Sequence, residues 1–460
     1  MRRLALSCLS LSPSPAGASE SLMSDFYDIR ILKGNRTRIV LDNGKLEEIA
    51  EAPFQGAAVR ALTGGAWGFV TTDSVDGLGE KIDLAKRIAR KIDRHDELEL
   101  VKAPIGQSVT VPVKKDPKNL SLDEKVALLR EIENAALVKG VSSTQAVYSE
   151  VELTTHYTSS EGLDLESKTT RMGFVINAVA HRDGLYQTDG VGRAGVGGLE
   201  LFDREDPISL ARSVGETAVK LLDADTIKGG TYPVILDQEL AGVFVHEAVG
   251  HATEADIILE GDSCLEGKIG ERIGSELVTV KDDPSLMLNG YYPFDDEGSL
   301  AQETVLVEKG ILKSYLNSRE TAARLGGVPR NARAEGLDRP VVRMSNTYIT
   351  NGDWKLEEIL EALGNGVYLA GSRGGQVSTA EGIFQFNAKR GYLVESGEKT
   401  RLLRDVSLSG KILGTLKDVI AVGNDLKYNS GRCGKAGQLV PVSDGSPHLL
   451  VANATVGGAG

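Results

Sequence analysis

The segment "HEAVGH" at residues 246–251 contains two of the six histidines in the chain, and a glutamate directly follows the first. Two imidazoles and a glutamate in an apolar helix are the outline of a zinc hydrolase site, in which the histidines bind the metal and the glutamate takes a proton from water. This chemistry would assign His246 and His251 to the metal and Glu247 to general-base catalysis. The alternative for either histidine is a hydrogen-bonded position in the core, and the motif by itself favours that alternative.

The spacing of the two histidines exceeds the usual HExxH pattern by one residue. Residues four apart lie about 40° apart around an α-helix, whereas residues five apart lie about 140° apart. A straight helix would therefore point His246 and His251 to different faces. A π-bulge or a helix break would correct this, and Gly250 offers the backbone freedom for it. We predict that the helix bulges or breaks between the two histidines, near Gly250.

A catalytic zinc usually has three protein ligands and an open position, so a third ligand must come from elsewhere in the chain. The candidate is Cys433 in "NSGRCGKAGQ", because a thiolate is a soft ligand that suits zinc and the surrounding glycines would let the backbone approach a metal. The alternative is that Cys433 is a small hydrophobic residue of the core. Glu254 and Asp256 are candidates to orient the histidines from behind.

The composition is that of a soluble globular protein with two or three domains, at 460 residues and 41% hydrophobic content. A formal charge of −13 argues against nucleic acid as a partner, since phosphate binding needs a basic surface. No stretch is long and apolar enough to span a membrane. The three cysteines lie too far apart for a disulfide framework and favour a reducing compartment, so we expect a cytoplasmic protein.

Residues 1–22 have a composition that differs from the rest of the chain. Two arginines, a short apolar run and a small-residue site resemble a secretory signal, but serine interrupts the apolar run. We interpret this stretch as a disordered or misassigned leader, with the signal peptide as the alternative.

The N-terminal half alternates between strand-like and helical patterns. Residues 26–72 read as short strands separated by turns at Asn43-Gly44 and Gly64-Gly65. Two helices should follow: the first presents Ala85, Ile88, Ala89 and Ile92 on one face, and the second opens with a capping box at Ser121 and Glu124.

Further along, residues 145–202 return to alternation, which predicts an antiparallel sheet, and Pro207 should start another helix. A polar, glycine-containing run at 223–230 is the best candidate for a domain boundary. Residues 231–237 then read as a buried strand and 238–259 as one long apolar helix. Short strands dominate from 297 onward, broken by helices near 317–325 and 354–363.

Six short motifs of the chain occur together and in order in the TldD/PmbA (TldD/TldE) family of metalloproteases, and the chain resembles the TldD subunit of that family from about residue 25 onward. The motifs are "HEAVGH" at 246–251, "DDEG" at 295–298, "RMSNTY" at 343–348, "GGQV" at 374–377, "VGNDL" at 422–426 and "CGKAGQ" at 433–438. Because several separated motifs stand in register, the resemblance favours the metal interpretation of the two histidines.

The resemblance implies that His246, His251 and Cys433 bind one zinc ion per chain and that Glu247 is the general base. It also implies a peptidase that acts on unfolded or extended peptides and pairs with a second, homologous subunit. Our prediction is thus an α+β protein with a mixed α/β domain at 23–222 and a β-rich metallopeptidase domain at 229–460, which carries the HExxxH helix.

Two alternatives to this function stay open. The chain could be a peptide-binding or scaffolding subunit with a structural or absent metal, although such a subunit has no use for Glu247. It could also hydrolyse a small amide instead of a peptide. The sequence does not identify the group that stabilises the oxyanion, for which Tyr292, Arg343 and His448 are only candidates.

Two glycine-rich segments remain. "GVGRAG" at 190–195 matches a dinucleotide-binding pattern, but no helix opening follows it, so we reject that function. "SRGGQVSTAEGIFQF" at 372–386 predicts an interior strand with a bulge at Gly374-Gly375. The alternative for this segment is the binding of an extended peptide by β-augmentation.

Overall fold

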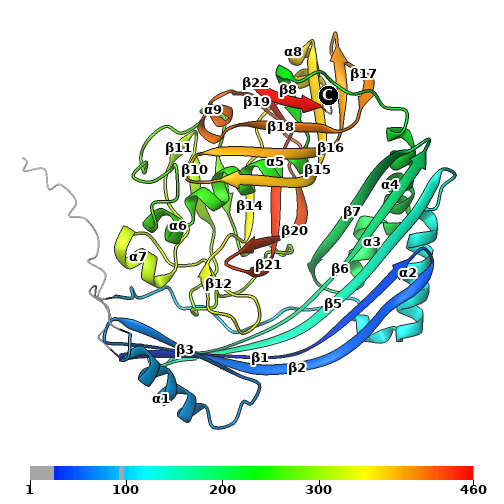
Figure 1. Ribbon diagram of the computed structural model, residues 1–460. Coiled ribbons are helices and arrows are strands. Elements are labelled where there is room, and N and C mark those ends of the chain that lie inside the picture. Colours follow the sequence, from blue (N-terminus) through cyan, green and yellow to red (C-terminus); the bar gives the residue numbers. More distant parts are fainter. Residues whose placement is uncertain (1–24, 93–97, 459–460) are drawn as a thin grey trace, which may run out of the picture.

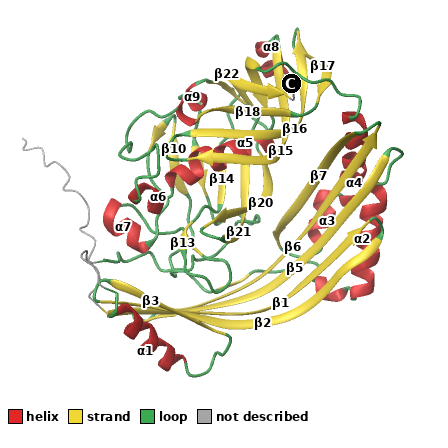
Figure 2. Cartoon of the chain, in the orientation of Figure 1, coloured by secondary structure: helices red, strands yellow, loops and turns green. Residues whose placement is uncertain are grey.

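A computed structural model describes residues 25–92 and 98–458 (Figure 1). The chain folds into an N-terminal unit built on one long, seven-stranded sheet and a C-terminal unit built mainly on a six-stranded and a seven-stranded sheet. The helices lie outside the sheets or between them and do not alternate with parallel strands (Figure 2). The predicted α+β class is therefore confirmed. The predicted leader at residues 1–22 lies outside the described residues.

The N-terminal sheet curves around one side of the C-terminal unit (Figure 1). Its order is β3-β2-β1-β5-β6-β7, all antiparallel, and β4 pairs with β6 in parallel. The glycine-containing turns predicted at Asn43-Gly44 and Gly64-Gly65 are present, and all four residues have positive φ. The strands are β1 (Asp25–Asp42), β2 (Lys45–Thr63), β3 (Ala66–Thr72), β4 (Val109–Thr110), β5 (Val141–Ser159), β6 (Asp164–Arg182) and β7 (Leu185–Val196).

Helices cover the face of this sheet that is turned away from the C-terminal unit (Figure 2). They are α1 (Leu78–Ala89), α2 (Leu122–Ala136), α3 (Glu200–Glu205) and α4 (Pro207–Leu221), with a 3₁₀ turn at Pro117–Asn119. The capping box of Ser121 and Glu124 opens α2 as predicted, and Pro207 is the first residue of α4. The apolar sides of α2 and α4 share one core with β5 and β6.

The predicted apolar face of α1 is only partly correct. Ala85 and Ala89 are buried, but Ile88 is 36% exposed and Ile92, beyond the helix end, is 46% exposed. The reason is a close approach to β3, where a Cβ atom on Gly68 would lie 1.8 Å from the carbonyl oxygen of Ala85. Small residues let the backbones come together, and the larger isoleucines are left at the margin.

The described part of the C-terminal unit contains two main sheets with a helix between them, and a separate two-stranded sheet of β12 and β13. One sheet has the order β11-β10-β9-β14-β21-β20, and in the other the pairings β15-β8-β22-β18-β16-β15 close a ring of five strands. Its strands are β8 (Gly230–Leu236), β9 (Val280–Asp282), β10 (Thr304–Glu308), β11 (Ile311–Leu312), β12 (Ala332–Arg333), β13 (Val341–Val342), β14 (Asn346–Ile349), β15 (Gly366–Ser378), β16 (Ile383–Glu395), β17 (Glu398–Leu403), β18 (Val406–Lys411), β19 (Val419–Val422), β20 (Lys427–Lys435), β21 (Gln438–Ser446) and β22 (Leu449–Gly458).

The central helix α5 packs against both sheets and buries all its apolar residues except Val243, which is partly buried. Residues 238–259 do not form the single long helix that the sequence predicted, because the α-helical turns stop at Val245 and resume only at Ala255. The helices of this unit are α5 (Gln238–Val245), α6 (Ala255–Leu259), α7 (Arg319–Leu325), α8 (Leu356–Leu363) and α9 (Ile412–Lys417). Both α7 and α8 lie where the sequence predicted them.

Buried ion pairs join the two units. The guanidinium of Arg60, on β2, contacts Asp28 on β1 and lies 3.1 Å from Glu297 of the C-terminal unit, and all three side chains are at most 6% exposed. Arg319 of α7 lies 2.6 Å from Glu161 in the N-terminal unit. Charged groups taken out of water need such partners, so these pairs fix how the units meet.

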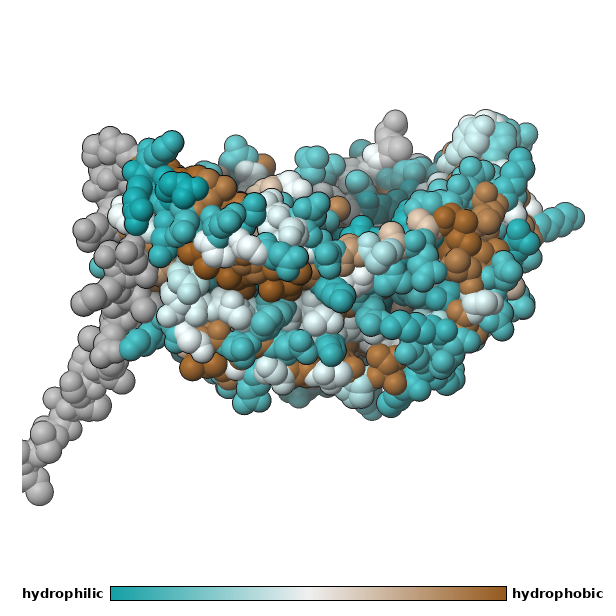
Figure 3. All heavy atoms as spheres, turned by 90° about the horizontal axis from the view of Figure 1, so that it is seen from below, coloured by the Kyte–Doolittle hydropathy of each residue, from teal (hydrophilic) through white to brown (hydrophobic). Residues whose placement is uncertain are grey.

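No helix in the described part of the chain is long and apolar enough to cross a membrane. The face seen from below in Figure 3 is largely hydrophilic, with separate hydrophobic patches.

Replacement of Arg60 by alanine should lower the free energy of unfolding by about 3–5 kcal/mol, because Asp28 and Glu297 would stay buried without their partner. Urea unfolding followed by circular dichroism measures the change. Arg38→Ala is the matched control, since Arg38 forms an exposed pair with Glu48 that should contribute at most about 1 kcal/mol. Equal, small losses in both variants would contradict the role of the buried cluster.

Candidate metal centre

A π turn at His246–Gly250 continues α5 and absorbs the extra residue between the two histidines. The helix begins at an N-cap, Asp237, whose carboxylate accepts a hydrogen bond from the amide of Leu240. In the π turn the amide of His251 donates to the carbonyl of His246, five residues earlier, and a 3₁₀ turn at His251–Thr253 follows. The wide turn brings both imidazoles to one side, and the predicted bulge is confirmed.

The bulge lies near Gly250 as predicted, but the physical reason that we gave for a glycine there was wrong. Gly250 has φ −54° and ψ −64°, a right-handed conformation that any residue adopts, so backbone freedom is not what the site requires. A Cβ atom at Gly250 would instead lie 1.9 Å from the sulfur of Met344, which is fully buried. Glycine is needed here for close packing against Met344, a contact that the sequence did not predict.

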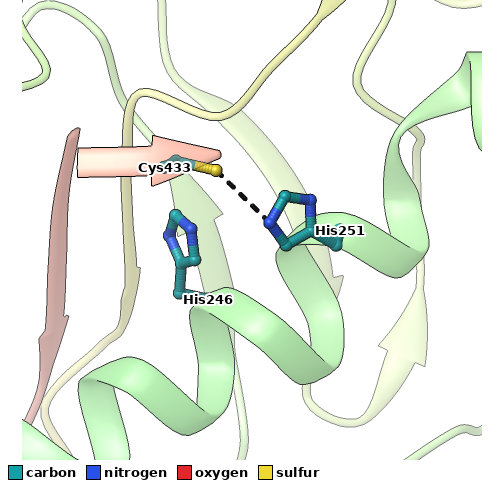
Figure 4. Close-up of side chains that lie close together, drawn as sticks. All are labelled: His246, His251 and Cys433. Carbon is teal, nitrogen blue, oxygen red and sulfur yellow. Dashed lines mark hydrogen bonds between the residues drawn. The ribbon is translucent and has the colours of Figure 1, made fainter. Parts of the chain in front are cut away.

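Cys433 reaches the two histidines from β20, which forms a hairpin with β21 through a turn at Ala436-Gly437. Its Sγ lies 3.3 Å from Nε2 of His251, and the donor atoms of His246, His251 and Cys433 all lie within 4.8 Å of one another (Figure 4). Arg343, fully buried, donates to the carbonyl of Cys433 and holds the strand there.

The chemistry and spacing of this donor set fit a zinc ion. Two nitrogens and a sulfur are common zinc ligands, and ligands of a tetrahedral zinc lie about 3.5 Å apart, so small side-chain movements suffice. Nδ1 of His246 is buried and has no hydrogen-bond partner among the described residues. Figure 4 shows this nitrogen on the side of the ring turned away from Cys433, so the other ring nitrogen, Nε2, faces the donor group.

The three donors stabilise one another electrostatically. Burial disfavours the thiolate of Cys433, but the two imidazoles outweigh this effect and lower its pKa to about 4. Burial likewise disfavours the charged imidazoles, yet the thiolate raises the pKa of His246, and Glu254 together with Cys433 raises that of His251 well above its usual value. A low-pKa thiolate is the form of cysteine that binds metals.

A chain of polar contacts fixes the ring of His251 from behind. Nδ1 of His251 lies 2.8 Å from the fully buried Glu254 carboxylate, so Nε2 faces Cys433. Lys435 in turn donates to Glu254 over 3.1 Å and to Asp256 over 2.7 Å. Glu254 therefore has the orienting position that the sequence suggested, whereas Asp256 acts only through Lys435.

Lys435 itself was missed by the sequence analysis. It stands two residues after Cys433 on β20, and residues two apart in a strand point to the same face. That spacing, together with the two acidic residues after His251, was the signal that could have identified it.

Glu247 lies at the open side of the cluster. Its side chain is 28% exposed, and its Oε2 is 3.8 Å from Nε2 of His251. A carboxylate beside the donor set and in contact with solvent can reach a water molecule there.

The three candidates for oxyanion stabilisation have other partners. Tyr292 donates to the carbonyl of Arg330, Arg343 binds backbone carbonyls of the Cys433 hairpin, and His448 lies between Asp425 and Tyr368. These contacts give each of the three side chains a structural role.

The chain matches three family models that together describe PmbA/TldA metallopeptidases. Domain 1 matches residues 27–89, the central domain residues 115–222, and the C-terminal domain residues 229–458. The C-terminal model covers all the residues of the site described above.

Curated relatives match over nearly their whole length. A metalloprotease from Methanothermobacter thermautotrophicus is 45% identical over 94% of this chain and 96% of its own. A zinc metalloprotease TldD homologue from Saccharolobus solfataricus is 30% identical over 96% of this chain and 98% of its own.

Solved structures share the fold at low sequence identity. A candidate modulator of a DNA gyrase from Thermotoga maritima has a TM-score of 0.80 at 24% identity and covers 94% of this chain and 96% of its own. TldE from Thermococcus kodakarensis has a TM-score of 0.73 at 19% identity, with 95% and 97% covered.

Gly250→Ala should destabilise the protein by about 1–3 kcal/mol, because the added methyl group overlaps Met344 in a filled core. Gly79→Ala is the control, since a Cβ at Gly79, also in a helix, meets no atom within 4 Å. Thermal unfolding of both variants measures the effect. A Gly250→Ala protein as stable as the parent would contradict the packing role.

In chelator-treated protein, Cys433 should remain a thiolate down to a pH of about 5, since its pKa is lowered to about 4. Burial raises the pKa of Cys264, which should therefore contribute no thiolate in this range. The ultraviolet absorbance of the thiolate, followed during acid titration, should persist in the parent and vanish in Cys433→Ser. Loss of the parent's signal near pH 8.5, the ordinary thiol value, would refute the assignment.

Proposed function

The chain belongs to the PmbA/TldD family of metallopeptidases, and we propose that it hydrolyses peptide bonds of extended peptides at one zinc ion held by His246, His251 and Cys433. The observation that carries the proposal is the convergence of these three buried donors within 4.8 Å, with Glu247 beside them. The name of the zinc metalloprotease relative supports zinc as the metal.

The residues around the donors have different roles in the reaction. A zinc ion held by the three donors would supply Lewis-acid chemistry for the scissile carbonyl and for a water molecule. Glu247 would take a proton from the water molecule whose oxygen bonds to the carbonyl carbon, and would pass that proton to the leaving amine as the C–N bond breaks. Glu254 and Lys435 keep the His251 ring in place during these steps.

Glu247 is also what argues against the competing function, a peptide-binding subunit with a structural metal. A structural zinc site is closed by four protein ligands, whereas three donors group together in the described part of the chain, beside a carboxylate that is not fully buried. Three donors beside such a carboxylate fit a catalytic site better than a structural one.

We further propose that the chain works with a homologous second subunit. The fold is similar to that of TldE, a protein that is named separately from TldD, and this similarity supports such a pair. Whether the partner is a paralogue or a second copy of this chain can be read from the mass of the native complex.

Purified protein should contain about one zinc ion per chain, and His246→Ala and Cys433→Ala should each lose it. Glu247→Gln should keep the metal but lower kcat/KM for an unstructured peptide by about 10²–10⁴. Elemental analysis and peptide mass spectrometry measure the two quantities separately, and Glu216→Gln, an exposed change on α4, is the control. Zinc retained in both ligand variants, or full activity in Glu247→Gln, would overturn the proposal.

A further inference from the structure

A cavity of about 510 Å³ lies between the N-terminal sheet and the C-terminal unit. One wall comes from β6 and β7, and the other from the start of α5 and from β15, β16 and β20. Both glycine-rich segments of the sequence, 190–195 and 372–386, contribute residues to it, the first from β7 and the second from β15. Each of these segments also carries an arginine that lines the cavity.

Glycines on β7, which have no side chains, help to keep the cavity open. At the edge of β7, the carbonyl of Thr188 accepts from Arg373 over 2.6 Å, and the amide of Ala194 donates to Ser430 over 2.8 Å. Gly190 and Gly192 lie between these anchor points, and a Cβ on Gly190 would come 2.2 Å from the side-chain oxygen of Asn177. The two units are therefore in contact at both ends of the stretch that contains these two glycines.

The opposite wall has the predicted bulge. The register of β15 against β16 shifts between Ser372 and Gly375, and Gly374 has φ +83°. The amide of Ser372 donates to Glu239 on α5, which fixes the segment. This bulge interrupts the strand pairing where Arg373 stands and directs its side chain across to β7.

The residues that line the cavity carry more positive than negative charge. Both acidic groups have basic neighbours: Glu239 lies 2.7 Å from Lys389, and Asp189 lies 3.8 Å from Arg390. Arg193 is paired with Glu205 over 2.9 Å. Arg373 is exposed, and in the part of the chain that the structure describes no carboxylate lies within 4.0 Å of it. Within the described residues its guanidinium donates one hydrogen bond, to the carbonyl of Thr188, which leaves further N–H donors available.

The cavity and the metal centre lie along the same two elements. Glu239, on α5, and His246, the first residue of the π turn that continues α5, are seven residues apart, which is two turns and about 10 Å along one face. Asn429, in the cavity wall, and Cys433 are four residues apart on one face of β20, about 13 Å. An extended peptide covers this distance with three or four residues.

We propose that this cavity is a subsite for a peptide carboxylate, which Arg373 binds three or four residues from the scissile bond. The proposal rests on the proposed peptidase function. A guanidinium offers two parallel N–H donors to a carboxylate, which gives the contact its direction. The carboxylate has two chemical sources, the side chain of aspartate or glutamate and the free C-terminus of the peptide.

The test is equilibrium binding of labelled peptides to the full-length Glu247→Gln protein, measured by fluorescence anisotropy. Three unstructured peptides are compared: one with a single aspartate and an amidated end, one with asparagine and an amidated end, and one with asparagine and a free C-terminal carboxylate. We expect at least one carboxylate peptide to bind about fivefold more tightly than the neutral peptide. Which of the two does so identifies the source.

Introducing Arg373→Met into the Glu247→Gln protein should remove this preference and should change the affinity for the neutral peptide little. Arg212→Met is the matched control, because Arg212 is an exposed arginine on α4, on the far side of the N-terminal sheet. Equal affinities for all three peptides, no binding of any of them, or a preference that survives Arg373→Met would overturn the subsite.

Hydrolysis is measured separately, so that the two proposals can fail independently. If the protein with Glu247 intact cuts the neutral peptide, the peptidase function stands whatever the binding preference. In that protein the cut should move by one residue when the preferred carboxylate is moved by one residue, and Arg373→Met should abolish this shift. A cut position that ignores the carboxylate in the parent protein would also overturn the subsite.

Discussion

The hydrogen bond from the amide of His251 to the carbonyl of His246 is the constraint on which the candidate metal centre depends. A regular α-helix would direct residues five apart to different faces, and only a π turn returns the second imidazole to the side of the first. The wider turn must then be accommodated by its neighbours. Gly250 does this by bringing the backbone against Met344, and the chain leaves the helix directly afterwards.

Polar contacts tie Cys433 to the segment that carries the two histidines. Lys435 reaches from β20 to the carboxylate that holds His251, so one lysine ties the strand with the thiol to the segment with the imidazole. Arg343 binds the carbonyl of Cys433 itself. Two stretches of chain about 180 residues apart are thereby joined by buried polar contacts, which are directional in a way that apolar packing is not.

Local signals explain most of what the sequence could predict. The turn at Asn43-Gly44, the capping box at Ser121 and the start of α4 at Pro207 depend on a few adjacent residues, and all three are present. The bulge between the histidines followed from spacing alone. The grouping of Cys433 with the histidines is seen in the structure, but its function as a ligand stays a proposal.

What the sequence could not give depends on contacts between distant segments. We predicted that Ile88 is buried, but it is 36% exposed because Gly68 of β3 approaches α1 closely. No pattern of neighbouring residues in the sequence indicates that approach. Gly250 was assigned to the right place for the wrong reason, since Met344 lies more than ninety residues away. The same limit applies to the charges of the site itself. The thiolate and imidazolium groups satisfy one another's charge, so a metal bound at the proposed ligands would replace protons in a framework that Glu254, Lys435 and Arg343 already hold.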